Sequence, residues 1–381
     1  MAPRRPDKIT ITDVARHAGV STATAGRVLG GYGYTSTEVR DRVRASAEAM
    51  GYRPNLLARS LITGRTKTIG VVAGDIQSPF YASMLRGISD VARTEGFGVI
   101  VTNTDERSDR EIEAVQLLLE KQVDGLIVAP SDLLNSPHLH AAIEGGCPVV
   151  QVDRIVAGLP ADSVTVDNRG AARDAVAHLI AAGHRRIGIV AELERSAYGS
   201  VAAFVRAVED DRVEATALFP SWQRLYGYLD AHRSAGLTIE PAFIARVGEY
   251  SVAAGKAETL KLLDRQQRVS ALFTADGLMS AAAMDAITTL EMAIPTDVSL
   301  VCFDDLDWMR FAKPGISAVV QPLLELGETA ASTVLSRIQG DTSASRHVTL
   351  LPQLALRGSV QGLPGSLASA RDDGPSPPTR P

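Results

Sequence analysis

The spacing of hydrophobic positions changes near residue 66. Before that point, apolar side chains recur every three or four residues in three short stretches, as expected for small amphipathic helices. After it, runs rich in valine and isoleucine alternate with helix-length segments such as 83–95 and 109–121. This alternation predicts parallel sheets covered by helices. The expected fold is therefore a small all-α domain followed by a larger α/β domain.

Eight apolar runs are expected to be strands of the larger domain. They read TIGVVAGD, GVIVTNT, VDGLIVAP, CPVVQVD, SVTVDN, RRIGIVAE, SALFTAD and VSLVCFDD. A single hydrophobic core rarely exceeds roughly 250–300 residues, so a region of this length should split into two subdomains. Ligands of open α/β sheets bind beyond the carboxyl ends of the strands. The polar residues that end these runs are thus binding-site candidates: Asp75, Asp153, Asp167, Asp276 and Asp304.

The N-terminal domain carries the start and stop signals of helices. Thr10 and Asp13 have the spacing of a capping box and open the first helix. Gly19 is expected to end it, and Ser21 to cap a second helix that runs to about Leu29. This leaves a connection of only three or so residues. Two short helices joined in this way form a helix-turn-helix.

A third helix is expected after a second capping box, formed by Thr35 and Glu38. Its apolar stripe would comprise Val39, Val43, Ala47 and Met50, with Gly51 at its end. Three small helices of this kind can share one compact core.

The second helix of a helix-turn-helix lies in the DNA major groove, with its N-terminal residues at the base edges. Thr22, Ala23 and Arg27 are therefore predicted to face bases, and Arg27 can bind a guanine through two hydrogen bonds. Phosphate or positioning contacts are expected from Thr10, Ser21, Thr24 and Tyr52. The alternative is that these are ordinary surface residues of a small helical bundle.

Charge divides the chain in the same place. Residues 1–65 hold eleven Lys and Arg against five Asp and Glu, a net charge of +6. Because the whole chain has a net charge of −5, the remaining residues carry −11. A basic head on an acidic body is typical of a nucleic-acid-binding module joined to another domain. None of the apolar runs in the 381 residues approaches the roughly 20 that a membrane helix needs, and the N-terminus lacks the apolar region of a secretory signal. A cytoplasmic protein is expected. The two cysteines, Cys147 and Cys302, have the spacing of neither a disulfide framework nor a metal site.

Two long segments carry a family resemblance. ITDVARHAGVSTATAGRVLGG and RVRASAEAMGYRPNLLARSLITGRTKTIGVV closely resemble the N-terminal region of LacI/GalR-family transcriptional repressors, and the resemblance continues through almost the whole chain. It implies a flexible N-terminus at 1–8, a helix-turn-helix domain at 9–53 and a hinge helix at 54–66. In the family this helix orders on operator DNA, pairs with its dimer mate and inserts a leucine into the minor groove. The matching residue here is Leu61, with Asn55 and Arg59 nearby.

For the body, the resemblance implies a two-lobed domain like that of periplasmic sugar-binding proteins, with three crossovers and an effector in the cleft. The first lobe would be about 67–165 and 322–350, the second about 166–321 and 351–362, and the Pro- and Ser-rich tail 363–381 is expected to be disordered. The family's effector positions fall on Gln77, Phe80, Asp153, Arg154, Arg224 and Asp304. An aromatic face, carboxylates and arginine suit a polyol, whose hydroxyls both donate and accept.

The chain departs from the family pattern in several places. Ala25 and Gly26 stand where valine and serine are usual, Gly30 and Ala275 replace asparagines, and Gln77-Ser78 replaces Ser-Asn. Between IGIVAE and WQRLYGY the chain also has about 20 residues more than the family spacing, an addition of the kind that loops tolerate. These changes leave the identity of the effector open.

The leading hypothesis is a dimeric, effector-controlled repressor of a pseudo-palindromic operator, with neither cofactor, metal nor catalytic residue. The effector would be a sugar or sugar derivative, with a nucleoside or purine-like compound, or a co-repressor, as alternatives. An enzyme is the rival of another class, but the carboxylates of Asp304 and Asp305 would point to opposite faces of a strand, and glycoside hydrolysis needs them facing. Nucleotide-binding, nucleophile-elbow and zinc-protease motifs are missing. A transport-type sugar-binding protein would explain the body and leave the helix-turn-helix unexplained.

Overall fold

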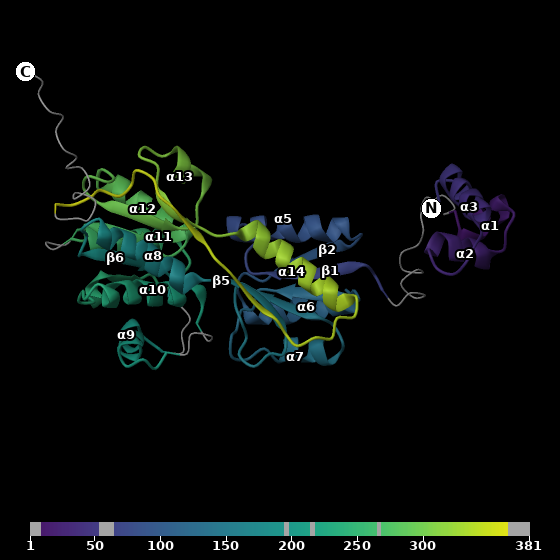
Figure 1. The fold of residues 1–381 in the computed structure, drawn as a ribbon, viewed down its shortest axis with the longest axis horizontal. Helices are drawn as coiled ribbons and strands as arrows, with labels where there is room; N and C mark the ends of the chain where they lie inside the picture. The colour runs from purple at the N-terminus through teal and green to yellow at the C-terminus, as the bar shows by residue number, and fades with distance from the viewer. Residues whose placement is uncertain (1–8, 53–64, 194–197, 214–217, 265–267, 365–381) are drawn as a thin grey trace, which may run out of the picture. The chain divides into compact units, whose positions relative to one another are not determined.

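The computed structural model describes residues 9–52, 65–193, 198–213, 218–264 and 268–364. The chain divides into two compact units, a small N-terminal one (Met1–Thr68 with Lys121–Asp124) and a large one that holds the rest (Figure 1). We call residues 9–52 the head and residues 69–364, within the described ranges, the body. Each is described separately. In the part of the chain that is described, the helices are too short or too polar to cross a membrane.

The head consists of helices α1 (Ile11–Ala18), α2 (Thr22–Gly30) and α3 (Thr37–Ala49). The capping box of α1 is confirmed: the Thr10 side chain accepts from the Asp13 N–H, and the Asp13 side chain accepts from the Thr10 N–H. Gly19 ends α1 in the left-handed conformation with φ +64°, and Ser21 caps α2. The tight turn predicted from these residues is therefore confirmed.

The third helix begins differently from the sequence prediction. Its cap is Ser36, whose hydroxyl accepts from the Val39 N–H, so the capping box expected at Thr35 and Glu38 is wrong. The cap moves by one residue because Ser36 is the residue whose hydroxyl reaches an unpaired N–H of the first turn. The stripe of α3 is confirmed, since Val43 and Ala47 are buried and Val39 and Met50 pack against the same core.

The first lobe of the body is built on a six-stranded sheet in the order β11-β5-β4-β3-β1-β2. Its strands are β1 (Thr68–Ala73), β2 (Gly98–Asn103), β3 (Gly125–Val128), β4 (Val149–Val152), β5 (Asp162–Val166) and β11 (His347–Leu350). Its helices are α5 (Pro79–Thr94), α6 (Ser108–Glu120), α7 (Pro137–Glu144) and α14 (Leu323–Ile338). α5 and α14 cross closely at Gly87 and Gly327, where an added Cβ would come within 2.2 and 2.0 Å of the other helix's backbone.

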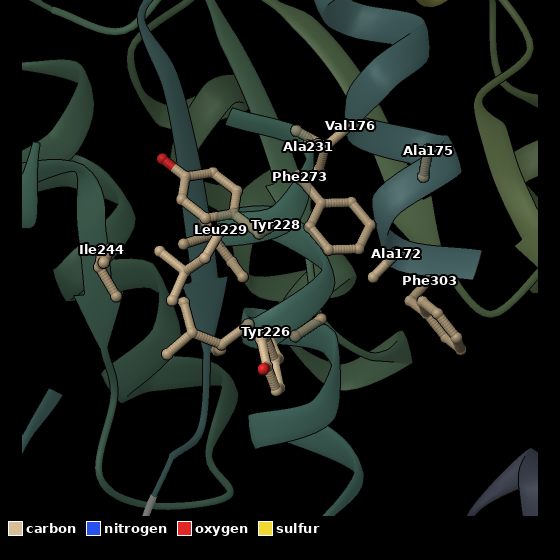
Figure 2. Packing of buried hydrophobic residues seen from close by; sticks show 14 of the residues in the cluster. Ala172, Ala175, Val176, Tyr226, Tyr228, Leu229, Ala231, Ile244, Phe273 and Phe303 are labelled. Atoms are coloured by element: carbon tan, nitrogen blue, oxygen red, sulfur yellow. The ribbon is translucent and has the colours of Figure 1, made fainter. Parts of the chain in front are cut away.

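The second lobe is built on a sheet in the order β12-β10-β9-β8-β6-β7. Its strands are β6 (Ile187–Ala191), β7 (Ile244–Arg246), β8 (Ala271–Thr274), β9 (Ser299–Phe303), β10 (Ser317–Val320) and β12 (Gln353–Ala355). Its helices are α8 (Asn168–Ala181), α9 (Val201–Glu209), α10 (Pro220–Ser234), α11 (Val252–Leu263), α12 (Gly277–Thr289) and α13 (Asp307–Phe311), with a short 3-10 helix, η2 (Pro241–Phe243). Figure 2 shows part of its core, in which Tyr228, Phe273 and Phe303 are fully buried.

All eight expected strands are present, as β1 to β6, β8 and β9. Four short strands, β7, β10, β11 and β12, were not predicted. The expectation of parallel sheets holds for most pairs, but β12 runs antiparallel to β10. The chain passes between the two sheets three times, after β5, after β10 and after β11. Residues near the carboxyl ends of strands in both sheets can therefore contribute to one site.

Candidate functional site

The first candidate surface is the exposed face of α2 in the head. Thr22, Ala23 and Arg27 are exposed, while Ala25 and Val28 on the opposite side pack into the head core. Arg27 Nε donates to the Ala23 carbonyl at 3.4 Å, a long bond that leaves most of the guanidinium available. This is the arrangement that base-edge contacts require, with the polar groups at the N-terminal end of a short helix facing outward.

The remaining DNA-contact candidates of the head have structural roles as well. Ser21 Oγ accepts from the Thr24 N–H at 3.1 Å and lies 2.9 Å from Thr24 Oγ1. Thr10 Oγ1 donates to Asp13 Oδ2 at 2.6 Å, and these hydrogen bonds from Thr10 lower the pKa of Asp13. Tyr52 packs against the head core. Asn55, Arg59 and Leu61, the hinge candidates, lie outside the described residues.

The second candidate site is a cavity of about 180 Å³ in the body. Its walls include four aspartates that directly follow, or lie one residue beyond, a strand's buried stretch: Asp75, Asp153, Asp276 and Asp304. Asp153 and Asp304 adopt the left-handed conformation, with φ +66° and +72°. A positive φ in a residue other than glycine is uncommon and clusters at functional sites. The carboxyl ends of strands from both sheets thus meet at this cavity.

Arg154 is tied to carboxylates on the first-lobe side of the cavity. Its Nη2 donates to Glu106 Oε1 at 3.0 Å, its Nη1 contacts Glu106 Oε2, and its Nε donates to Asp153 Oδ2 at 3.1 Å. Tyr81 donates its hydroxyl to Glu106 Oε1 at 3.0 Å. Burial raises the pKa of Asp153, although the positive charges of Arg154 and Arg224 act in the opposite direction.

Arg224 of α10 is the second guanidinium of the cavity and is only 6% exposed. Its Nε donates to Asn168 Oδ1 at 2.9 Å, and its Nη1 donates to the Ala275 carbonyl at 2.6 Å. The guanidinium carbon lies 3.8 Å from the centre of the Phe303 ring. Nη2 makes no hydrogen bond to a described residue, so both of its N–H groups are left to bind a ligand.

Two further aspartates hold helix α12 as well as lining the cavity. Asp276 caps α12 by accepting the Met279 N–H at 2.8 Å, and burial raises the pKa of Asp276 to about 6. Asp304 accepts the Gly277 N–H at 3.0 Å on Oδ2, and Gln321 Nε2 at 2.5 Å on Oδ1. The start of α12 is therefore built into the cavity wall.

Five of the six effector candidates line this one cavity: Phe80, Asp153, Arg154, Arg224 and Asp304. Gln77 is not among the lining residues; it is exposed, its backbone N–H donates to Asp75 Oδ1 at 2.9 Å, and Asp75 and Ser78 line the wall instead. Asp167 is also outside the lining; its carboxylate caps α8 at the Gly170 N–H, 2.8 Å away.

Some lining residues were not predicted from the sequence. They include residues that follow strands β2 and β6 and residues at the end of the additional segment between β6 and α10. The lining residues outside the predicted effector set include Tyr81, Glu106, Glu192, Phe219, Ser221, Tyr250 and Gln321. Glu106 follows β2, and no sequence motif marks it. Its partner Arg154 is 48 residues away in the sequence, and only the fold brings the two side chains together. The strand-end rule does point to Glu192, one residue beyond β6.

The additional segment between β6 and α10 folds onto the second lobe. Helix α9 buries Phe204, whose ring centre lies 5.0 Å from that of Trp222 and 5.2 Å from that of Tyr198, both in edge-to-face contact. The end of this segment brings Phe219 into the cavity wall, where its ring lies 5.4 Å from the Arg154 guanidinium. Ser221 Oγ donates to Glu192 Oε2 at 3.3 Å. The segment therefore shapes one wall of the cavity.

Groups suited to metal binding or to nucleophilic catalysis are scarce. Within the described ranges, no cluster of three or more His, Cys, Asp or Glu side chains is arranged to hold a metal ion. Both cysteines are free thiols; Cys302 is buried, and burial raises its pKa to about 11, which opposes a nucleophilic thiolate.

Comparison with known families identifies the head and the body as domains. Residues 10–55 match the family of bacterial regulatory proteins of the lacI type, and residues 66–211 match the periplasmic binding proteins and sugar-binding domain of the LacI family. Residues 176–360 match a periplasmic-binding-protein-like domain. The first of these matches covers the head, and the other two together cover the body.

Similar proteins align over nearly their full length. Catabolite control protein A of Priestia megaterium is 30% identical over 93% of this chain and 99% of its own, and the HTH-type transcriptional repressor CytR of Escherichia coli K12 is 30% identical over 95% and 99%. A solved complex of the transcriptional regulator CelR with cellobiose matches with a TM-score of 0.65 and 28% identity, over 93% of this chain and all of that one. The chain therefore belongs to the LacI family of DNA-binding transcriptional regulators.

Proposed function

We propose that this protein is a repressor that binds a two-fold symmetric operator as a homodimer and is controlled by a carbohydrate effector held in the body cavity. The observation that carries the proposal is the composition of the cavity wall. Side chains that follow strands of both sheets line it, so a ligand inside touches both lobes. A ligand with contacts to two lobes can shift their arrangement by as much as its affinity differs between the two arrangements.

The lining chemistry supports a carbohydrate. The carboxylates can accept hydrogen bonds from sugar hydroxyls, and Arg224 Nη2 can donate hydrogen bonds to sugar hydroxyls. The Phe80 ring offers an apolar face for a sugar ring. CelR, a relative in this family, was solved with cellobiose. The cavity is thus equipped for a compound that both donates and accepts over most of its surface.

The edge of the first-lobe sheet supports a homodimer. β2 is the last strand of its sheet, and its Ile100 and Val101 are 38% and 42% exposed. Ile112 and Leu117 of the neighbouring helix α6 are each 45% exposed. A long edge strand with apolar side chains on its surface favours pairing with another chain. A second copy of this protein is the partner that a two-fold symmetric DNA site requires.

The proposal is tested by selecting binding sites from a random DNA library with the full-length protein. An inverted repeat is expected, with half-sites about one helical turn apart, and binding that weakens steeply as salt concentration rises. Binding to a single unrepeated site, or to DNA without sequence preference, would contradict the proposal.

The effector part of the proposal is tested on the selected operator by fluorescence anisotropy with a panel of monosaccharides, disaccharides and nucleosides. A sugar is expected to change operator affinity, and the sign of the change distinguishes an inducer from a co-repressor. If nucleosides alone change the affinity, the effector is not a carbohydrate.

A further inference from the structure

The body cavity has a surplus of negative charge. Six carboxylate side chains line it, those of Asp75, Glu106, Asp153, Glu192, Asp276 and Asp304, against two guanidinium groups. Lysine and histidine are missing from the lining residues that the structure describes. An anionic ligand entering this space would face more like charges than opposite ones.

Both arginines already donate to protein acceptors, and Arg154 offers little to an anion. Arg154 is committed to the Glu106 and Asp153 carboxylates and, through Nη1, to the Pro130 carbonyl at 3.2 Å. Arg224 donates from Nε to Asn168 and from one N–H of Nη1 to Ala275, so two of its five N–H groups are already used. Recognition of phosphate or carboxylate by arginine normally uses two parallel N–H donors, and Arg154 has no such pair left.

The cavity wall also has hydrogen-bond acceptors that no described donor uses. Asp276 is 8% exposed and accepts one hydrogen bond on Oδ1, from Met279, while Oδ2 accepts none from a described residue. Gln321 is 7% exposed, and its buried Oε1 has no hydrogen-bond partner among the described residues. A buried acceptor without a donor costs free energy until a ligand supplies one. The cavity therefore favours a ligand that can donate to Asp276 Oδ2.

We propose that the effector is an aminated carbohydrate, whose protonated amine is held by the Asp276 carboxylate, and that phosphorylated and acidic sugars are rejected. The inference rests on the proposed function, since it names the chemical class of the effector in the same cavity. An ammonium group brings three donors, no acceptor and one positive charge. Its hydrogen bonds to a carboxylate are stronger than those of a neutral hydroxyl.

The aromatic lining fits the same ligand. Phe80, Phe219 and Tyr250 line the cavity together with the carboxylates, and Phe219 already lies 5.4 Å from one cation, the Arg154 guanidinium. Aromatic faces attract organic cations as well as the apolar face of a sugar ring. Burial also raises the pKa of the Asp276 carboxyl to about 6, although the Met279 N–H and the Arg224 charge act in the opposite direction.

The test measures binding to the full-length protein near neutral pH by titration calorimetry. Glucose, galactose and mannose are each compared with their 2-amino, N-acetylated 2-amino and 6-phosphate derivatives. In at least one series the free amine is expected to bind about tenfold more tightly than the neutral parent, and the phosphate more weakly than the parent. The N-acetyl compound, which keeps the nitrogen without its charge, is expected to lose the advantage.

The variant Asp276→Asn separates charge from fold, because asparagine caps a helix as well as aspartate. It is expected to bring the amine-to-parent ratio close to one. Asp285→Asn is the matched control, since Asp285 is on the same helix, is half exposed and pairs with Lys256 at 2.8 Å. It is expected to leave the ratio unchanged.

Equal binding of amine and parent in every series, tighter binding of a phosphate, or a ratio that survives Asp276→Asn would overturn this inference. If a neutral sugar changes operator affinity and the amines do not, the proposed function stands and the inference alone fails. If no sugar binds and nucleosides do, the carbohydrate effector fails with it.

Discussion

The polar residues of the head and those of the body cavity are held in opposite ways. In the head, the hydrogen bonds of Thr10, Ser21 and Arg27 span three or four residues and lie on an exposed surface. In the cavity, Arg224 and Asn168 are 56 residues apart in sequence and bond to each other in a buried place. The difference teaches that recognition and stability can be changed separately in the head, whereas in the cavity they depend on the same side chains.

The largest expected effect is that of Arg224→Met in the cavity. It removes the donors of the Asn168 and Ala275 oxygens and the stacking on Phe303, and buried acceptors without partners cost about 1–3 kcal/mol each. The free energy of unfolding should fall by about 3 kcal/mol, and effector binding should be lost. Urea denaturation measures the free energy of unfolding, and calorimetry measures effector binding.

Arg173→Met is the control, because Arg173 of α8 is half exposed and pairs with its neighbour Asp174. If Arg224→Met unfolds like the wild type, the two regions do not differ as described.

The next largest effect concerns pH and Asp276. Its pKa is about 6 in the folded protein, above the ordinary 3.8, so between these values the folded state binds the proton that the unfolded state has released. The contribution of this group to stability therefore falls as pH rises from about 4 to above 6, by about 3 kcal/mol for a shift of about two units. Asp276→Asn removes this dependence.

Urea midpoints of the unliganded protein check the pH prediction. Wild type and Asp276→Asn should unfold alike near pH 4, and the variant should be the more stable near pH 7.5. A difference that stays constant between the two pH values would contradict a raised pKa at this site.

In the head, Arg27→Ala should change recognition alone. Loss of the guanidinium from the exposed face of α2 is expected to weaken operator binding by about 1–3 kcal/mol and to relax base preference at one position. Thermal unfolding should be unchanged, since among the described residues the hydrogen bond lost is the long one to Ala23. Arg93→Ala, at an exposed body residue, removes the same charge as a control. Unchanged affinity and selectivity would mean that α2 is not the recognition helix.

The smallest effect is expected from Gly26→Ala, which should change stability alone. An added Cβ would lie 3.5 Å from Tyr32 Oη and 3.8 Å from Ile11 Cδ1, which is ordinary contact, so the helix should gain up to about 1 kcal/mol. Amide hydrogen exchange in α2 measures the gain. Gly19→Ala is the contrast: an added Cβ would meet nothing within 4 Å, but the φ of +64° makes it destabilising. Faster exchange in the Gly26 variant would show that the glycine is needed there.

Gly26 also bears on DNA contact, since serine is usual at this position in the resembling family. Gly26→Ser adds a hydroxyl on the same helix and is expected to tighten operator binding, measured by anisotropy. Weaker binding would indicate that the backbone at Gly26 approaches the duplex closely.

The contrast also explains which parts of the structure could be predicted from the sequence. The capping box of Thr10, the turn at Gly19 and the eight predicted strands depend on residues close together in the chain, and all are present. The cap of α3 was misplaced by one residue because Thr35 and Ser36 are chemically equivalent candidates, and only the backbone geometry selects Ser36.

Part of the cavity was beyond sequence reasoning for a physical reason. Phe80, Asp153, Arg154, Arg224 and Asp304 came from family spacing, and they line the cavity. Glu106 carries no local signal, because its role depends on the fold bringing it to Arg154. Phe219 belongs to the additional segment, whose packing through Phe204 and Trp222 no family spacing describes. The strands β7 and β12 are three residues long, too short for a periodic pattern to emerge.

The most direct test of the account is the operator affinity of the full-length protein with and without a saturating cavity ligand, in wild type and in Arg224→Met. Coupling of the two sites predicts that the ligand changes wild-type affinity by about 5–150-fold, with the operator changing ligand affinity by the same factor, and that the variant shows no change. A ligand shown by calorimetry to bind the wild type, yet leaving its operator affinity unaltered, would contradict the claim that this cavity controls DNA binding.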